Sequence, residues 1–152
     1  MKLLCDQMLG SLAKWLRILG FDTYYANAES SDLKLIKIAI NEDRVVISRD
    51  KELIYRCKKQ NLSVIEIKDI DLDLQLKKVL SKFKIDKNNI LSLCSICNSR
   101  ITLVDKKKVK GKVPEKVYEN KEKFWYCKRC NKYYWAGSHY LKILDKIRSF
   151  QD

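Results

Sequence analysis

The sequence predicts an α/β fold in which a mainly parallel sheet covered by helices is followed by a smaller unit and a C-terminal helix. Two observations lead to this prediction. Short apolar runs alternate with segments of helical periodicity through residue 90, and two Cys-x-x-Cys pairs follow in the remainder. Alternation of this kind is typical of repeated βα units, whose short links require parallel strands. We therefore expect two units, residues 1–90 and residues 91–152, joined by the polar segment 84–89.

The first part of the larger unit contains two strands and two helices. Apolar runs and helical periodicity predict them, in alternation, over residues 2–5, 7–19, 21–26 and about 30–40. Gly20 follows the first helix, at a place where a helix end requires positive φ. Ser30 and Ser31 precede the second helix and are its candidate N-caps.

The second part of this unit repeats the pattern. Strands and helices are expected, again in alternation, over residues 45–48, 51–60, 64–67 and 72–83. Residues 45–47 are Val, Val and Ile, which is typical of a buried strand. A last helix is expected over residues 140–150.

Composition excludes several classes of protein. The 152 residues are 46% hydrophobic and 34% charged, with 4 Gly and 1 Pro, so collagen-like and disordered chains are excluded. The longest purely apolar runs have four residues, whereas a membrane span needs about 20. The N-terminus lacks the apolar stretch and cleavage site of a secretory signal. We expect a cytoplasmic protein without a membrane partner.

The charge is strongly basic and unevenly distributed. The formal net charge is +13, of which residues 91–152 carry +9 and residues 1–90 carry +4. Such a surplus attracts polyanions, so nucleic acid is the expected partner. The alternative is a solvated basic surface that serves solubility alone.

The two cysteine pairs indicate a metal site. Cys94 and Cys97 form one pair and Cys127 and Cys130 the other, with 29 residues between the pairs. The separation is longer than the common spacing of about 15–20 residues, but two Cys-x-x-Cys pairs are otherwise typical of a zinc ion held by four thiolates. An all-sulfur site is structural and not catalytic. The alternative is two disulfides, which are rare in a reducing compartment.

Two asparagines next to these pairs, and the two cysteines outside them, have expected structural roles. Asn98 and Asn131 directly follow the pairs, and Asn tolerates the left-handed conformation that a zinc knuckle needs there. Cys5 and Cys57 have no partner at ligand spacing and are expected to be small buried apolar residues.

Acidic residues follow the first three strands of the larger unit. Asp6 follows the first, Asp32 lies after the second at a helix start, and Asp50 follows the third. Because the carboxyl ends of parallel strands meet at one edge, these carboxylates are expected to converge. Three carboxylates repel one another unless a cation neutralises them, and oxygen ligands suit Mg²⁺ or Mn²⁺. The alternative is that each is a helix N-cap or a first-turn acid that complements the helix dipole. Asp22 precedes its strand, where a structural role is expected.

Competing chemistries have little support. The sequence has neither a dinucleotide-binding nor a P-loop glycine motif, and it contains 1 His. That single histidine excludes a site built from two histidines, and no Ser-His-Asp arrangement is apparent.

Several segments together resemble the Mut-seven C-terminal RNase domain family. They are DQMLGSLAKWLRILGFDT at residues 6–23, SRDKEL at 48–53, the two cysteine pairs, VPEKVYE at 113–119 and YYWAGSHY at 133–140. The resemblance implies a PIN-like, three-layer ribonuclease domain with a zinc ribbon at its C-terminal end. It also implies that Asp6, Asp32 and Asp50 bind the catalytic metal and that Glu52 is an additional acid. Ser48 stands where the family usually has Thr, and it keeps the hydroxyl group.

Basic and aromatic residues are candidate RNA contacts. Lys14, Arg17 and Arg49 are expected to hold phosphates near the acids, and Lys106, Lys107 and Lys108 form part of a basic loop between the cysteine pairs. Four rings, Trp125, Tyr133, Tyr134 and Trp135, are interleaved with basic residues, which suits stacking of unpaired bases. The alternative for most of these rings is packing in the small core of the ribbon. His139, at the start of the last helix, is a further RNA-binding candidate.

The sequence therefore predicts hydrolysis of RNA, expected to be single-stranded, by one or two Mg²⁺ or Mn²⁺ ions that activate a water molecule. The alternative is a non-catalytic RNA-binding or toxin-antitoxin-like module whose acids are structural helix caps. The sequence identifies no protein partner.

Overall fold

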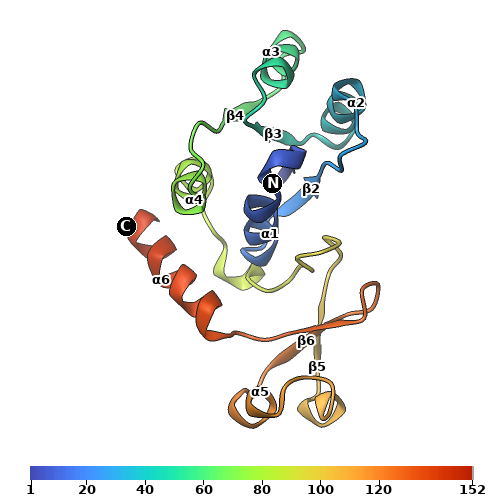
Figure 1. The fold of residues 1–152 in the computed structure, drawn as a ribbon, viewed down its shortest axis with the longest axis vertical. Helices are drawn as coiled ribbons and strands as arrows, with labels where there is room; N and C mark the ends of the chain where they lie inside the picture. Colours follow the sequence, from blue (N-terminus) through green and yellow to red (C-terminus); the bar gives the residue numbers. More distant parts are fainter. Residues whose placement is uncertain (152) are drawn as a thin grey trace.

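The computed structural model describes residues 1–151 and confirms the α/β class (Figure 1). Four parallel strands form its larger sheet: β1 (Lys2–Cys5), β2 (Asp22–Tyr25), β3 (Val45–Ser48) and β4 (Val64–Glu66). Their order is β2-β1-β3-β4, so β1 and β3 are the central strands. The order reverses between these two strands, and in such sheets ligands bind at the carboxyl ends beside the reversal.

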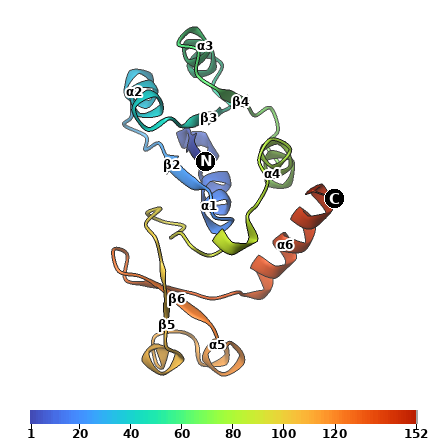
Figure 2. The same cartoon turned by 180° about the vertical axis from the view of Figure 1, so that it is seen from behind.

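Helices cover both faces of this sheet. α1 (Gly10–Ile18) and α4 (Leu72–Leu80) lie on one face, and α2 (Asp32–Glu42) and α3 (Lys51–Lys59) lie on the other (Figures 1 and 2). Side chains of β1 point alternately to the two layers. Leu3 and Cys5 are buried with residues of α1 and α4, whereas Leu4 is buried with residues of α2 and α3. The predicted parallel sheet is therefore the middle of three layers.

The helix expected over residues 7–19 begins with a 3₁₀ turn, η1 (Gln7–Leu9), and ends before Gly20. Gly20 has φ +94°, and a Cβ atom there would lie 2.4 Å from the carbonyl oxygen of Asn89. Asn89 ends a short 3₁₀ turn, η2 (Lys87–Asn89), in the connection that leads to the second unit. Glycine is required here both for its conformation and for the close approach of this connection to α1.

The second unit is a three-stranded antiparallel sheet. Its strands are β5 (Thr102–Val104), β6 (Phe124–Cys127) and β7 (Lys132–Tyr134), paired in that order. The segment between β5 and β6 contains a 3₁₀ turn, η3 (Lys106–Val109), and helix α5 (Glu115–Asn120). The sheet with its cysteine cluster is consistent with the expected zinc ribbon.

The last helix returns to the first unit. α6 (Ser138–Gln151) begins two residues before the predicted start and lies beside α4 in both views of the molecule (Figures 1 and 2). Ile143 and Ile147 are buried in the core that contains α1 and α4. α6 thus packs against the core of residues 1–90 although it follows the ribbon in the sequence. None of the helices within residues 1–151 is long and apolar enough to cross a membrane.

Candidate active site and metal centre

Three carboxylates line one hollow at the carboxyl ends of the central strands. Asp6 follows β1, Asp50 precedes α3, and Asp32 is the first residue of α2. They line a hollow of about 50 Å³, together with Asn27 and Ser30 from the loop after β2. The topology therefore brings to one place the three acids that the sequence singled out.

Asp6 is held in a fixed position. It is 4% exposed, and its Oδ1 accepts a hydrogen bond of 2.8 Å from the backbone N–H of Met8. Its Oδ2 accepts from the Ser48 hydroxyl and, at 3.2 Å, from the backbone N–H of Arg49. Ser48 also accepts from the Asp50 N–H at 2.9 Å, so one hydroxyl links the ends of β1 and β3.

Asp50 is exposed and caps α3. Its Oδ1 accepts hydrogen bonds from the backbone N–H groups of Glu52 (2.9 Å) and Leu53 (3.3 Å). Capping therefore occupies one carboxylate oxygen, and Oδ2 has no hydrogen bond within residues 1–151. The capping role and a ligand role for Asp50 are compatible.

Asp32 differs from the other two acids because it is not a cap. Ser31 caps α2, accepting from the backbone N–H of Lys34 at 3.2 Å. Burial raises the pKa of Asp32, and the neighbouring Asp50 carboxylate raises it further, with smaller contributions from Glu52 and Asp6. The Asp32 carboxylate is therefore repelled by the Asp50 and Asp6 carboxylates that line the same hollow, and a cation bound there would offset this repulsion.

Glu52 does not line the hollow. It is exposed, and its Oε1 accepts from Arg56 at 2.8 Å along the same helix. The Arg49 side chain is half-buried directly after β3, next to the acids, and Lys14 is exposed on α1.

The position of Arg17 corrects one expectation. The side chain is 7% exposed, and its Nε donates to the carbonyl oxygen of Thr23 at 2.9 Å. Its Nη1 donates to the carbonyl oxygens of Ser95 (3.1 Å) and Ile96 (2.9 Å), between the first two cysteines. Arg17 thus joins the first cysteine loop to α1 and cannot also hold an RNA phosphate.

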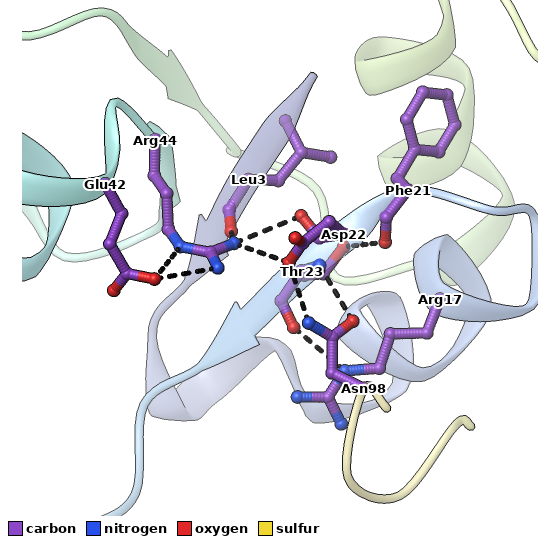
Figure 3. Close-up of polar contacts among 8 residues, drawn as sticks. All are labelled: Leu3, Arg17, Phe21, Asp22, Thr23, Glu42, Arg44 and Asn98. Atoms are coloured by element: carbon purple, nitrogen blue, oxygen red, sulfur yellow. Dashed lines mark hydrogen bonds and ion pairs between the residues drawn. The ribbon is translucent and has the colours of Figure 1, made fainter. Parts of the chain in front are cut away.

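Figure 3 shows further contacts between this loop and the sheet. Asn98 Nδ2 donates to Asp22 Oδ1 at 2.7 Å, and Asn98 Oδ1 accepts from the Thr23 N–H at 3.0 Å. Asp22 also pairs at 2.9 Å with the buried Arg44, which pairs with Glu42. Although burial acts to raise it, the hydrogen bonds from Asn98 and Arg44 hold the pKa of Asp22 below its ordinary value. These contacts agree with a structural role for Asp22.

The four cysteines of the two pairs converge on one point. The sulfur atoms of Cys94, Cys97, Cys127 and Cys130 all lie within 4.8 Å of one another, and the Cys97 and Cys127 sulfurs are 3.6 Å apart. Four sulfurs at about 2.3 Å from a zinc ion in tetrahedral geometry are about 3.8 Å apart. All four are free thiols, so the residues fit a zinc ion and the disulfide alternative is not observed.

The ionisation of these thiols also favours a cation. Burial acts to raise the pKa of Cys97, but hydrogen bonds from Ser99 and the neighbouring thiols lower it to about 6. The contact with Cys97 and, next, burial raise the pKa of Cys130 to about 12. A zinc ion bound at this point would stabilise the thiolate form of its ligands.

Two residues have roles in this cluster that the sequence did not indicate. Tyr134 places its hydroxyl 2.9 Å from the Cys94 sulfur and 3.2 Å from the backbone N of Ser95. Asn98, expected only to adopt positive φ, does so at 68° and also binds the sheet through its side chain. Asn131 has φ 53°. Tyr134 and Asn98 contact residues distant in sequence, and no local pattern identifies such contacts.

The remaining candidates lie away from the hollow. Lys106, Lys107 and Lys108 form most of η3, and Lys106 pairs with Glu122 at 3.1 Å. His139 is exposed, and its ring meets that of the buried Trp15 edge-on, with centroids 5.6 Å apart. Cys5 and Cys57 are buried, as the sequence predicted.

One comparison with known proteins gives a match. A family model described as Mut7-C RNAse domain matches residues 1–147. The match includes both the three carboxylates and the four clustered cysteines. No curated protein and no solved structure matches the chain.

Proposed function

Because the chain belongs to the Mut7-C RNAse domain family, we propose that it hydrolyses RNA at the hollow lined by Asp6, Asp32 and Asp50. The substrate bond is a phosphodiester of single-stranded RNA. A helical duplex buries its bases and is read mainly by shape, whereas a single strand follows a narrow basic surface more easily.

The position of Asp32 is the observation that supports this proposal best. Asp6 and Asp50 accept backbone hydrogen bonds at helix starts, so structure alone accounts for them. Ser31 performs the capping role for α2, so Asp32 is a first-turn acid of that helix and not its cap. Burial and, next, the Asp50 carboxylate raise the pKa of Asp32. A partly buried carboxylate placed beside a second carboxylate favours a ligand role.

The donor set fits a hard divalent cation. Asp6, Asp32 and Asp50 would hold Mg²⁺ or Mn²⁺, since both metals favour carboxylate oxygens. When bound, such an ion lowers the pKa of a water molecule and offsets negative charge on the scissile phosphate. Ser48 fixes Asp6 through its hydroxyl hydrogen bond, and the capping bonds of Asp50 fix the rotation of that carboxylate. Arg49, next to Asp6, would bind a phosphate oxygen.

The four cysteines would hold a structural zinc ion. An ion with four sulfur ligands keeps no position open for water or substrate, so it takes no part in the hydrolysis. Its task is to stabilise the loop that contacts Arg17 and the edge of the sheet.

A non-catalytic RNA-binding module is the second candidate function. The capping bonds of Asp6 and Asp50 favour it, because they give two of the three acids a structural reason to be present. The two candidates differ in what they predict for Asp32.

The test compares Asp32→Asn with Asp22→Asn. Asp32→Asn should abolish Mn²⁺-dependent cleavage of a labelled single-stranded RNA, by on the order of 100-fold or more, while thermal stability does not fall. Asp22→Asn should lower stability, because Asp22 pairs with Arg44, and should leave cleavage near the parent rate. If the Asp32→Asn protein cleaves as fast as the parent, the acidic site is wrong. If the parent binds RNA but does not cleave it with Mn²⁺, the second candidate stands.

A further inference from the structure

A groove lined by aromatic rings lies between α1 and the ribbon. It has a volume of about 350 Å³ and is bordered by Lys14, Trp15 and Ile18 of α1, by β7 and by the start of α6. We call it the aromatic groove. Its principal side chains are Lys14, Trp15, Lys132, Tyr133, Trp135 and His139.

The rings of this groove are only partly used by the core. The Trp135 ring meets that of Phe124 at 60° with centroids 6.4 Å apart, yet Trp135 remains half-buried, and no hydrogen bond of its indole N–H appears among the described residues. His139 rests against Trp15 and is exposed on its other side. Tyr134 is fixed by its hydroxyl contacts with Cys94 and Ser95. The result is a surface of positioned rings that is open to solvent.

The charge of the groove has one sign. Lys14 and Lys132 lie on its border, and within residues 1–151 neither makes an ion pair; Lys132 lies only over the Tyr134 ring, 5.4 Å from its centroid. No Asp or Glu is among the residues that line the groove. Rings combined with unpaired lysines and no acid suit a ligand that has flat aromatic groups joined by anions.

α1 connects this groove to the acidic hollow. Gln7 borders the hollow, and Ser11 and Lys14, four and seven residues later, follow on one helical face and are exposed. Met8 of η1 lies at the hollow and Trp15 of α1 lies in the groove. With a rise of about 2.0 Å per residue in a 3₁₀ turn and about 1.5 Å in an α-helix, the two are about 11 Å apart along the chain axis. Stacked nucleotides advance about 3.4 Å each, so about three nucleotides cover this distance.

We propose that the aromatic groove binds an unpaired base of the single-stranded RNA substrate, about three nucleotides from the bond that is cleaved. This proposal rests on the proposed function for the identity of the substrate. Lys14 and Lys132 hold the phosphates on either side of the base, and Trp135 and His139 contact the base itself. The groove thereby sets which strand segment reaches the acids, while the hollow carries out the reaction.

The first experiment separates base contacts from charge. A labelled ten-nucleotide single-stranded RNA is compared with an abasic strand of the same length and phosphate number, and binding is measured by anisotropy without added Mg²⁺ or Mn²⁺. The parent protein should bind the base-bearing strand at least tenfold more tightly, because each stacked base contributes substantially to affinity. Equal affinity for the two strands overturns the proposal, because the surface would then recognise only charge.

Variants assign this preference to the groove. His139→Ala and Trp135→Leu should each reduce the preference for the base-bearing strand about fivefold or more. Trp135→Leu removes the ring contact with Phe124 and can unfold the ribbon. His139→Ala alters an exposed side chain, so it tests the proposal even if the Trp135→Leu protein does not fold. A His139→Ala protein that is folded and keeps the parent preference overturns the proposal.

The lysines are tested with a matched pair. Lys14→Gln with Lys132→Gln should lower the slope of log K against log salt by about 1.4, at about 0.7 per phosphate contact. Lys37→Gln with Lys58→Gln changes the net charge equally on exposed faces of α2 and α3 and should leave the slope unchanged. Equal slopes for the two pairs overturn the assignment of phosphates to this groove.

A photochemical measurement locates the base directly. RNA that contains 5-iodouridine, irradiated in the complex, should cross-link to residues 132–140, as mapped by mass spectrometry. Cross-links confined to the basic loop around η3 overturn the proposal. Cleavage by the parent with Mn²⁺ is assayed separately. If the groove effects fail while cleavage persists, only this inference falls; if cleavage is absent while the groove effects hold, only the proposed function falls.

Discussion

Asp6 and Asp50 each accept backbone hydrogen bonds at a helix start while they line the same hollow. Parallel α/β topology places helix starts and ligand sites at the same edge of the sheet. The sequence therefore could not distinguish caps from catalytic acids. For α2 the sequence predicted either Ser30 or Ser31 as the cap. Ser31 is the cap in the folded protein, so Asp32 does not have that role.

The raised pKa of Asp32 should affect how the stability of the protein depends on pH. Its pKa in the folded protein is raised above 3.8, so its favourable contribution is complete below pH 3.8 and is lost as the pH rises through the raised value. Asn stays neutral at every pH. Asp32→Asn should therefore have a higher Tm than the parent near pH 7 without divalent metal, and the difference should vanish towards pH 3.

Asp22→Asn is the control, because its effect on stability near pH 7 should have the opposite sign. The pKa of Asp22 is lowered, so its contribution is present above the ordinary value of 3.8 and is lost as the pH falls through the lowered one. This variant should be less stable than the parent at pH 7 and approach it in acid. Equal pH profiles for the Asp32→Asn protein and the parent would contradict the repulsion inferred at the hollow.

Arg17 shows why some single-residue roles escape prediction. In sequence it is a basic residue on a helix near candidate acids, which is typical of a phosphate contact. Its partners Ser95 and Ile96 are 78 and 79 residues away, and only the folded chain brings them to α1. The four clustered cysteines needed no such information, because the Cys-x-x-Cys spacing of each pair is local in the sequence.

At the scale of elements, alternation and helical periodicity predicted each strand of the parallel sheet and the helices between them. The bounds of the helices were less predictable, since the first helical segment begins as the 3₁₀ turn η1. The short helix α5 of the second unit was not predicted. The placement of α6 was not predictable, because its apolar face follows helical spacing whichever unit it covers. Its contact with α4 is set by the tertiary structure.

Substitutions in α6 test this placement. Ile147 is 2% exposed and Leu141 is 46% exposed on the same helix. Ile147→Ala should lower the free energy of unfolding by about 2–4 kcal/mol, because it leaves a cavity against α1 and α4. Leu141→Ala, the matched control, should change it by about 0.5 kcal/mol or less. Denaturant unfolding measures both, and similar small effects would mean that α6 does not support the first unit.

At the scale of the whole molecule, the acids and the zinc cluster lie at opposite edges of the parallel sheet. The hollow is at the carboxyl ends of β1 and β3, whereas the first cysteine loop contacts Asp22 and Thr23 at the amino end of β2. In Figure 1, the ribbon lies below α1, and α2 and α3 lie at the other end of the first unit. The docked loop is one contact through which a metal ion in the ribbon can affect the first unit.

Zinc removal should therefore loosen the edge of the parallel sheet. The Thr23 N–H donates to Asn98, whose position depends on the cysteine loop, so chelation or Cys94→Ser should speed its hydrogen exchange. The Val46 N–H, bonded to Ser63 inside the sheet, serves as the internal control and should stay protected. Protein purified without chelator should contain about one zinc per chain. Unchanged exchange at Thr23 after verified metal loss would show that the loop docks without zinc.

The basic loop gives the last prediction at this scale. Residues 91–152 carry +9 of the +13 charge, but Lys106 is held by Glu122 and lies over the Tyr118 ring, so it is not available to a phosphate. Lys107 and Lys108 are exposed, and neither side chain is in an ion pair within residues 1–151. If each meets one phosphate of a single strand, replacing both with Gln should lower the salt slope of RNA affinity by about 1.4.

Lys106→Gln is the informative comparison for that pair. Because Lys106 is already paired with Glu122, its replacement removes a positive charge without removing a phosphate contact, and it should lower the salt slope by much less than about 0.7. A slope that falls equally for each of the three lysines would indicate a diffuse field and not discrete contacts. An unchanged slope for the Lys107 and Lys108 pair would leave α1 and the aromatic groove as the path of the RNA between the ribbon and the acids.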